Sequence, residues 1–352
     1  MQIKIYTKAY APLTTLFVSR TESDYNDLTY HDALMQVGDA SFTMRLDNPK
    51  TTAANLKHYN IVEICEDDGT PRWVGVIVYK RVLFNVVSVS CYGMLHLLTR
   101  RITGAGESYS GTSAGDIAAA LLSNANGTSD TKIVAGTMDD PENVEVTFDR
   151  ASVFDSLKRI AEASGGQFRL NPDRTLDVRA MVGNDLSTSI ILHYRLALIA
   201  GANILAFQVE DDGKKITTKT SGESGGFTSD QTDSALNTEF GLLQEYKNFR
   251  ELDDQTSLDN AAAANNKGSE LSPLLDLSPK VADNFEVGDI VQVILENRLV
   301  SINDAYQVTD KTVKIKGGGE RQVSVRVISN TSDFFQQIRD LKRNVDLLER
   351  TV

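Results

Sequence analysis

An apolar side chain recurs every three or four residues near the end of this chain. The positions are Phe334, Ile338, Leu341, Val345, Leu348 and Val352, at spacings of four, three, four, three and four. This is the a/d pattern of a heptad repeat, and mostly charged or amide side chains fill the gaps. Asp333 and Gln336 have the spacing of a capping box. The pattern predicts a C-terminal coiled-coil helix whose apolar stripe packs against copies of itself.

The stripe is about two and a half heptads long, below the three to four that usually sustain a free coiled coil. We therefore interpret these six residues as an oligomer interface that clamps an assembly held together elsewhere. Their mixed Phe, Ile, Leu and Val composition suits two strands as readily as three, so trimer and dimer both remain open. The alternative is a helix packed on its own domain.

Composition sets limits on the function. The 352 residues have room for two to four domains, and the formal net charge of −12 argues against a main activity in binding phosphate backbones. Cys65 and Cys91 lie in separate strand-like runs, which favours buried free thiols over a disulfide scaffold. The most apolar stretch, residues 190–207, contains His193 and Arg195, so we expect no membrane anchor.

Residues 1–101 alternate apolar and polar side chains in short runs, which predicts a first antiparallel β-barrel (ring) domain. Residues 102–188 have mixed periodicity and predict a small α/β inserted domain. Its helices are expected to begin at Ser113–Asp116 and at Ser152, the second ending at Gly165. A hairpin around Asn171–Arg174 should follow.

The remaining chain returns to β patterning. Residues 189–270 predict the first part of a second β-barrel (ring) domain, residues 271–330 a small β domain with the return strands of that barrel, and residues 331–352 the terminal helix. We expect a hairpin around Asp211–Gly213 and a long mobile loop at Ser221–Asp233. The fold class predicted is α+β, mostly β, with two tube-like barrels.

No catalytic, cofactor-binding or metal-binding residues are predicted. His31, His58, His96 and His193 are scattered without a metal-ligand pairing. Paired aspartates occur at 67–68, 139–140, 211–212 and 253–254, where turn chemistry explains them better than glycoside hydrolysis. The glycine-rich segments lack the Lys-Ser/Thr of a phosphate-binding loop. We therefore expect a protein that is not an enzyme, although acid/base pairs assembled from distant strands would leave no local pattern in the sequence.

Several segments, taken in order, resemble one family. Trp73–Ile77, Val87–Gly93 and the run from Leu95 to Arg101 are similar to the first domain of bacteriophage tail hub proteins. Further segments resemble the family's inserted α/β domain and a strand entry in its later β domain: Phe148, Ser152, Leu157, Ile160, Ala161, Gly165, the hairpin from Phe168 to Leu176, and Phe285–Val291.

The resemblance implies a structural hub at the baseplate or tail tip. Such hubs are homotrimers in which two barrels per subunit make a ring of six similar barrels. The ring joins a six-fold tail tube, or a distal tail protein, to a three-fold central spike or fibre. Its channel passes DNA without specific binding in a phage, or ions in a phage-tail-like bacteriocin. The implied location is the virion tail, or a secreted tail-like particle, assembled in the host bacterial cytoplasm.

Two other functions remain as alternatives. A tail-tip cell-wall hydrolase or peptidase would need titratable side chains that converge in a cleft. A carbohydrate-binding adhesin would need exposed aromatic side chains, whereas Trp73 is the lone Trp and we expect it in the core beside Gly75. The sequence leaves open the host, the receptor, the choice between phage and bacteriocin, and whether the tail contracts.

Overall fold

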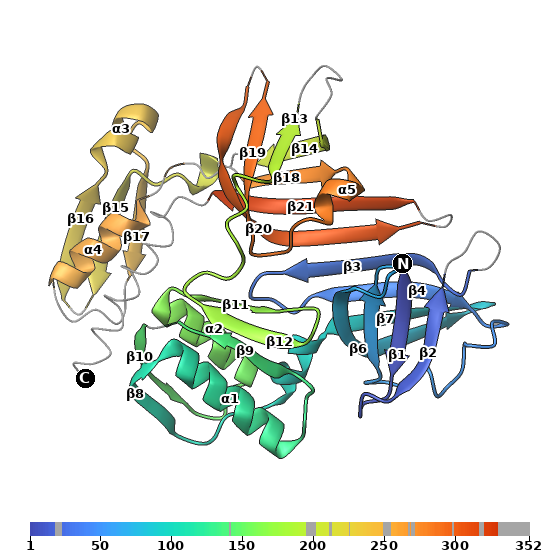
Figure 1. Cartoon of the computed structure of the whole chain (residues 1–352). Helices are drawn as coiled ribbons and strands as arrows, with labels where there is room; N and C mark the ends of the chain where they lie inside the picture. The colour runs from blue at the N-terminus through green and yellow to red at the C-terminus, as the bar shows by residue number, and fades with distance from the viewer. Residues whose placement is uncertain are drawn as a thin grey trace.

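The computed structural model describes residues 1–17, 23–140, 142–194, 202–210, 213–224, 226–248, 255–266, 268, 272–297, 299–316 and 320–329. Strands dominate, and they form one large and three small sheets (Figure 1). The predicted class, α+β and mostly β, is confirmed.

Two halves of the chain build the large sheet of thirteen strands. The first half contributes β1 (Gln2–Tyr6), β2 (Pro12–Phe17), β3 (Asn26–Ala33), β4 (Asp39–Arg45), β5 (Ile61–Cys65), β6 (Pro71–Leu83) and β7 (Val86–Gly93). The second half contributes β13 (Ile191–Tyr194), β14 (Ile204–Glu210), β18 (Ser272–Leu277), β19 (Ile290–Glu296), β20 (Ser301–Ile315) and β21 (Arg321–Ser329). A short helix, α5 (Pro279–Ala282), follows β18.

Each half curls so that its outer strands approach each other. In the first half, the Asp24 amide donates to the Phe17 carbonyl at 2.9 Å, which ties the end of β2 to the segment entering β3. In the second half, the Asn203 amide donates to the His193 carbonyl at 3.1 Å, which ties the start of β14 to β13. No closed barrel is detected among the described strands, whose order runs from β14 to β2 with β13 and β19 as a branch.

The long strand β20 joins the two halves. On one edge its first residues pair with β19, from Ser301 opposite Glu296 to Gln307 opposite Ile290. Its later residues, Asp310–Ile315, pair with Leu28–Ala33 of β3. The pairing of β20 with β21 shifts register between Val308 and Asp310, close to where the partner changes. A bulge bends a strand and increases its twist, which suits a strand that passes from one curled half to the other.

The core of the first half confirms two expectations. Trp73 is 3% exposed, and a Cβ atom added at Gly75 would lie 2.2 Å from its ring, so the indole occupies the space that glycine leaves. Cys65 and Cys91 are buried free thiols, on β5 and β7, which lie on opposite sides of β6. Burial raises the pKa of both thiols.

The insert follows a 3-10 helix, η1 (Met94–Arg100). Its elements are β8 (Glu107–Ser113), α1 (Ala114–Thr128), β9 (Val134–Met138), β10 (Asn143–Phe148), α2 (Val153–Ser164), β11 (Gln167–Leu170) and β12 (Thr175–Arg179). The hydroxyls of Ser113 and Ser152 accept from the backbone amides of Asp116 and Asp155, at 3.1 and 3.0 Å. Gly165 ends α2 in the left-handed conformation, with φ of 70°. The predicted helix starts and stop are confirmed.

A separate small unit lies between β14 and β18 in the chain (Figure 1). After the 3-10 turn η2 (Gly213–Lys215), it contains β15 (Lys219–Ser224), β16 (Phe227–Thr232), α3 (Ser234–Phe240), β17 (Gln244–Asn248) and α4 (Gln255–Asn265). Two predictions are wrong here. β14 pairs with β18, and β15 pairs with β16 and β17, so the described strands on the two sides of 211–213 do not form the predicted hairpin. The segment expected as a mobile loop forms the β15–β16 hairpin, with Gly226 at a φ of 91°.

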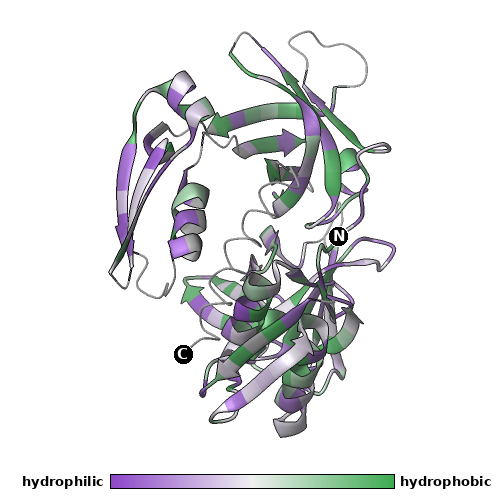
Figure 2. Cartoon of the chain, turned by 90° about the vertical axis from the view of Figure 1, so that its left-hand side faces the viewer, coloured by the Kyte–Doolittle hydropathy of each residue, from purple (hydrophilic) through white to green (hydrophobic). Residues whose placement is uncertain are grey.

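Small polar side chains explain the second error. Thr220 and Ser229 are buried in this unit. Their hydroxyls donate to the side-chain oxygens of Asn266 and Asp259, at 2.9 and 2.6 Å. The strands therefore satisfy their buried polar groups with hydrogen bonds and carry little of the apolar signal that marks strands elsewhere in the chain (Figure 2).

Candidate assembly site

The predicted oligomer interface cannot be placed on this fold. Its residues, Phe334, Ile338, Leu341, Val345, Leu348 and Val352, lie outside the described residues, as does the whole predicted terminal helix. The described residues instead reveal a charged junction between the two halves of the large sheet, at the pairing of β20 with β3. We call this junction the seam.

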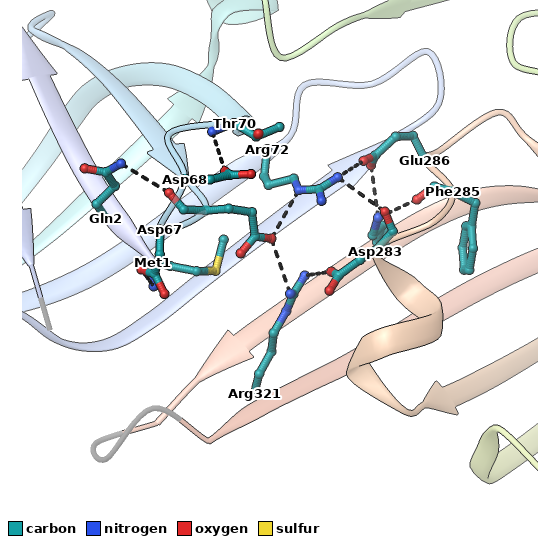
Figure 3. A network of polar contacts seen from close by, with 12 residues as sticks. Met1, Gln2, Asp67, Asp68, Thr70, Arg72, Asp283, Phe285, Glu286 and Arg321 are labelled. Atoms are coloured by element: carbon teal, nitrogen blue, oxygen red, sulfur yellow. Dashed lines mark hydrogen bonds and ion pairs between the residues drawn. The ribbon is translucent and has the colours of Figure 1, made fainter. Parts of the chain in front are cut away.

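Five charged side chains, two arginines and three carboxylates, bridge the seam on one side (Figure 3). The Arg72 guanidinium on β6 lies 3.1 Å from the Glu66 carboxylate and 3.0 Å from that of Glu286. Arg321 on β21 lies 3.3 Å from Glu66 and 2.6 Å from Asp283. Each arginine thus contacts one carboxylate from each half of the sheet. Because the arginine side chains are only 19% and 14% exposed, solvent screens these ion pairs less than surface ones.

Lys311 of β20 extends the same network. Its side chain is 5% exposed, and its ammonium group lies 3.0 Å from the Glu286 carboxylate and 2.6 Å from the Phe285 carbonyl oxygen. The ammonium also lies 5.3 Å from the centre of the Phe285 ring. A buried ammonium needs such partners, since losing them would leave an uncompensated charge.

Histidine and aspartate occupy the centre of the seam. The two ring nitrogens of His31 each lie 3.3 Å from a carboxylate, Asp39 on β4 and Asp310 on β20. The contact with Asp310 raises the pKa of His31. Burial acts to raise the pKa of Asp310, but hydrogen bonds from His31 and Thr309 hold it below its usual range. For the adjacent Asp32, burial and the nearby Glu286 raise the pKa to about 6.

The insert is fixed to the second half of the sheet as well. The side-chain amides of Gln167 and Gln307 exchange hydrogen bonds of 3.0 and 2.9 Å. Arg169 donates to the Val287 carbonyl at 2.5 Å, and the Asn184 amide donates to the Asp289 carboxylate at 2.8 Å. The two sheet halves and the insert are therefore connected by specific polar contacts.

The ion pairs of the seam were not foreseen from the sequence, because the partners are far apart in the chain. The aspartate pair at 67–68 does lie in a turn, as expected. Asp68 accepts from the Thr70 amide at 2.9 Å, and Asp67 lies 2.6 Å from the N-terminal ammonium of Met1. Among the described residues, no cluster of three or more His, Cys, Asp or Glu side chains could hold a metal ion.

Large apolar side chains are exposed at several places, of which two turns and the small unit are examples. Val82, Leu83 and Phe84 at the β6–β7 turn are 63%, 46% and 104% exposed, and Leu299 at the β19–β20 turn is 95% exposed. In the small unit, the exposed positions include Leu242 at 60% and Tyr246 at 64%. Exposed apolar groups that gather at one place mark contact surfaces. No described helix is long and apolar enough to cross a membrane.

Comparison with known proteins identifies the architecture. No family model and no curated protein sequence matches the chain. The solved tail protein of Neisseria meningitidis is 13% identical, with a TM-score of 0.67 over 96% of this chain and 98% of that one. The 43 kDa tail protein of a Shewanella oneidensis prophage is 12% identical, with a TM-score of 0.65 over 98% and 99%. The fold is that of phage tail proteins.

A third structure connects the fold to hub proteins. A component of the E. coli type VI secretion system, described as structurally similar to the bacteriophage T4 tail proteins gp27 and gp5, is 10% identical, with a TM-score of 0.54 over 88% of this chain and 74% of that one. The resemblance to tail hub proteins that the sequence indicates is thus confirmed for the fold.

Proposed function

We propose that this chain is the structural hub of a phage tail or of a phage-tail-like particle. Three copies would form a ring that joins the six-fold tail tube to a three-fold spike or fibre and encloses the channel. The observation that carries the proposal is the likeness in fold to phage tail proteins over nearly the whole length of both chains. We assign the chain no catalytic role.

The curled halves of the large sheet support a ring with two similar units per subunit. In each half, hydrogen bonds bring the outer strands together, at Asp24 in the first and Asn203 in the second. We propose that these halves act as the two barrel-like units of each subunit. The seam then holds neighbouring units of one subunit at a fixed angle, which a closed ring requires. The division of the chain at residues 101, 188, 270 and 330 stays a prediction.

The excess of acidic over basic residues supports a channel through which DNA passes without specific binding. With a formal net charge of −12, the chain as a whole repels the phosphate backbone. The proposed location is accordingly the tail of a virion or of a secreted tail-like particle, with the tube and a spike or fibre as partners.

Oligomer mass and shape test the proposal. Sedimentation equilibrium and electron micrographs of the purified chain should show a trimer with a central hole. Substituting Leu341→Asp together with Leu348→Asp should lower the oligomer mass, because each change puts a charge into an apolar contact. The matched control, Gln337→Asp with Asn344→Asp, adds the same charge beside the stripe and should leave the mass unchanged. A wild-type chain that stays monomeric at high concentration and shows no ring would contradict the hub.

A further inference from the structure

A cavity of about 630 Å³ lies between the first half of the large sheet and the insert. Its lining comes from the β1–β2 turn, the segment before β5, the end of η1 and the connection between α1 and β9. This volume falls within the range of pockets that bind small molecules or peptide side chains, and such pockets favour the boundary between structural units.

The rim of the cavity is basic, although the chain as a whole is acidic. Lys8, Lys57, Arg100 and Arg101 line it, together with His58, and Asp130 is the one carboxylate among its lining residues. Asp130 already pairs with Lys132. The four cationic side chains form no ion pair with a carboxylate of the described residues. The cavity therefore concentrates uncompensated positive charge in a chain of net charge −12.

Arg101 is held in place with spare hydrogen-bonding capacity. One terminal nitrogen donates to the Ser129 carbonyl at 3.2 Å and the other to the Arg100 carbonyl at 3.5 Å, while its buried Nε has no hydrogen-bond partner. Lys8, Lys57 and Arg100 are exposed. A ligand with several negatively charged acceptor groups would neutralise these three exposed cations.

The inner wall of the cavity is apolar. Ile61 and Val76 are buried at 2% and 1% exposure, and Ala54, Leu13 and Leu97 add further apolar surface. A ligand that used only the charged rim would leave this wall in contact with water. The lining thus favours a ligand that carries both negative charge and an apolar group.

We propose that this pocket, which we call the basic pocket, binds an acidic peptide segment with an apolar side chain, presented by a partner protein. The cations come from three separate segments around the mouth, an arrangement that suits several carboxylates along a peptide better than one small anion. The net negative charge of the chain as a whole repels an acidic partner, so a basic pocket also fixes where such a partner can dock.

Fluorescence anisotropy with labelled peptides tests the proposal on the full chain. The probe is a ten-residue peptide of alternating glutamate and leucine, and its analogues carry glutamine for glutamate or alanine for leucine. We expect the acidic amphipathic peptide to bind at least tenfold more tightly than either analogue, with affinity falling as salt is raised. Lys57→Glu with Arg100→Glu should weaken binding at least tenfold. Arg81→Glu with Lys314→Glu makes the same charge change at exposed sites outside the pocket and should have no effect.

Four results would overturn the proposal. The glutamine analogue could bind as well as the acidic peptide, or both pairs of substitutions could weaken binding equally, which would indicate a general charge effect. Citrate could displace the peptide at equal concentration, which would indicate a site for small anions. A single-stranded oligonucleotide could bind more tightly than the peptide. None of these results depends on whether the chain forms a trimer, so the pocket and the ring are tested separately.

Discussion

At the scale of single residues, Asp32 makes the stability of the seam depend on pH. The pKa of the Asp32 carboxyl is raised from 3.8 to about 6, because the folded protein disfavours its ionised form. The contribution of this group to the free energy of unfolding is therefore fully present below pH 3.8 and is lost as pH rises through about 6. We predict that Asp32→Asn raises the free energy of unfolding by about 1–3 kcal/mol at pH 8. At pH 4 the substitution should change little. Urea denaturation at the two pH values measures both effects.

Asp27→Asn serves as the control for Asp32→Asn. Asp27 is an exposed carboxylate on the same strand, β3, and its left-handed backbone, with φ of 51°, is one that asparagine tolerates. This control should alter stability little at either pH. Equal stabilisation by Asp32→Asn at pH 8 and pH 4 would show that charge at Asp32 is not the cause.

Residues whose role is set by near neighbours in sequence were predictable. The caps Ser113 and Ser152 act on amides three residues away, and Gly165 ends its helix through its own backbone freedom. Arg72 was not predictable, because its partner Glu286 lies 214 residues away. Most contacts of the seam likewise join residues that are far apart in the sequence, so they were not predictable.

At the scale of elements, Lys311 couples β20 to the segment that follows α5. We predict that Lys311→Met lowers the free energy of unfolding by about 2–4 kcal/mol, because the buried Phe285 carbonyl loses its donor and Glu286 loses one of its two cations. Lys314→Met, at an exposed position on the same strand, should cost less than about 0.5 kcal/mol. Chemical denaturation of both variants gives the comparison, and equal losses would argue against a special role for the buried ammonium.

Elements with apolar periodicity were predicted, and those without it were missed. The hairpin of β11 and β12 alternates Phe168, Leu170, Leu176 and Val178, and its position was foreseen. The hairpin of β15 and β16 buries threonine and serine instead, so its composition resembled that of a loop. Burial of hydrogen-bonded hydroxyls leaves no periodic hydrophobic signal in the sequence.

At the scale of the whole molecule, the sequence indicated β-rich regions but not how they pair. The strand β20 pairs with β19 at one end and with β3, far back in the chain, at the other. Side-chain alternation shows which face of a strand is buried, but it does not identify the neighbouring strand. The family resemblance, carried by an ordered series of short segments, indicated the fold of tail proteins, but it did not foresee the pairing of β20 with β3.

Phe84 tests whether assembly covers the exposed apolar turn between β6 and β7. Its side chain is 104% exposed and its φ is 49°, so Phe84→Asn removes no contact within the chain and suits the left-handed backbone. We predict that melting of the isolated subunit is unchanged while dissociation of the oligomer on dilution occurs at a concentration at least fivefold higher. Phe84→Leu keeps an apolar side chain on the same backbone and should retain most of the association. Sedimentation velocity across a dilution series measures this difference. Identical dissociation of the wild type and Phe84→Asn would mean that this turn faces solvent in the ring that we propose.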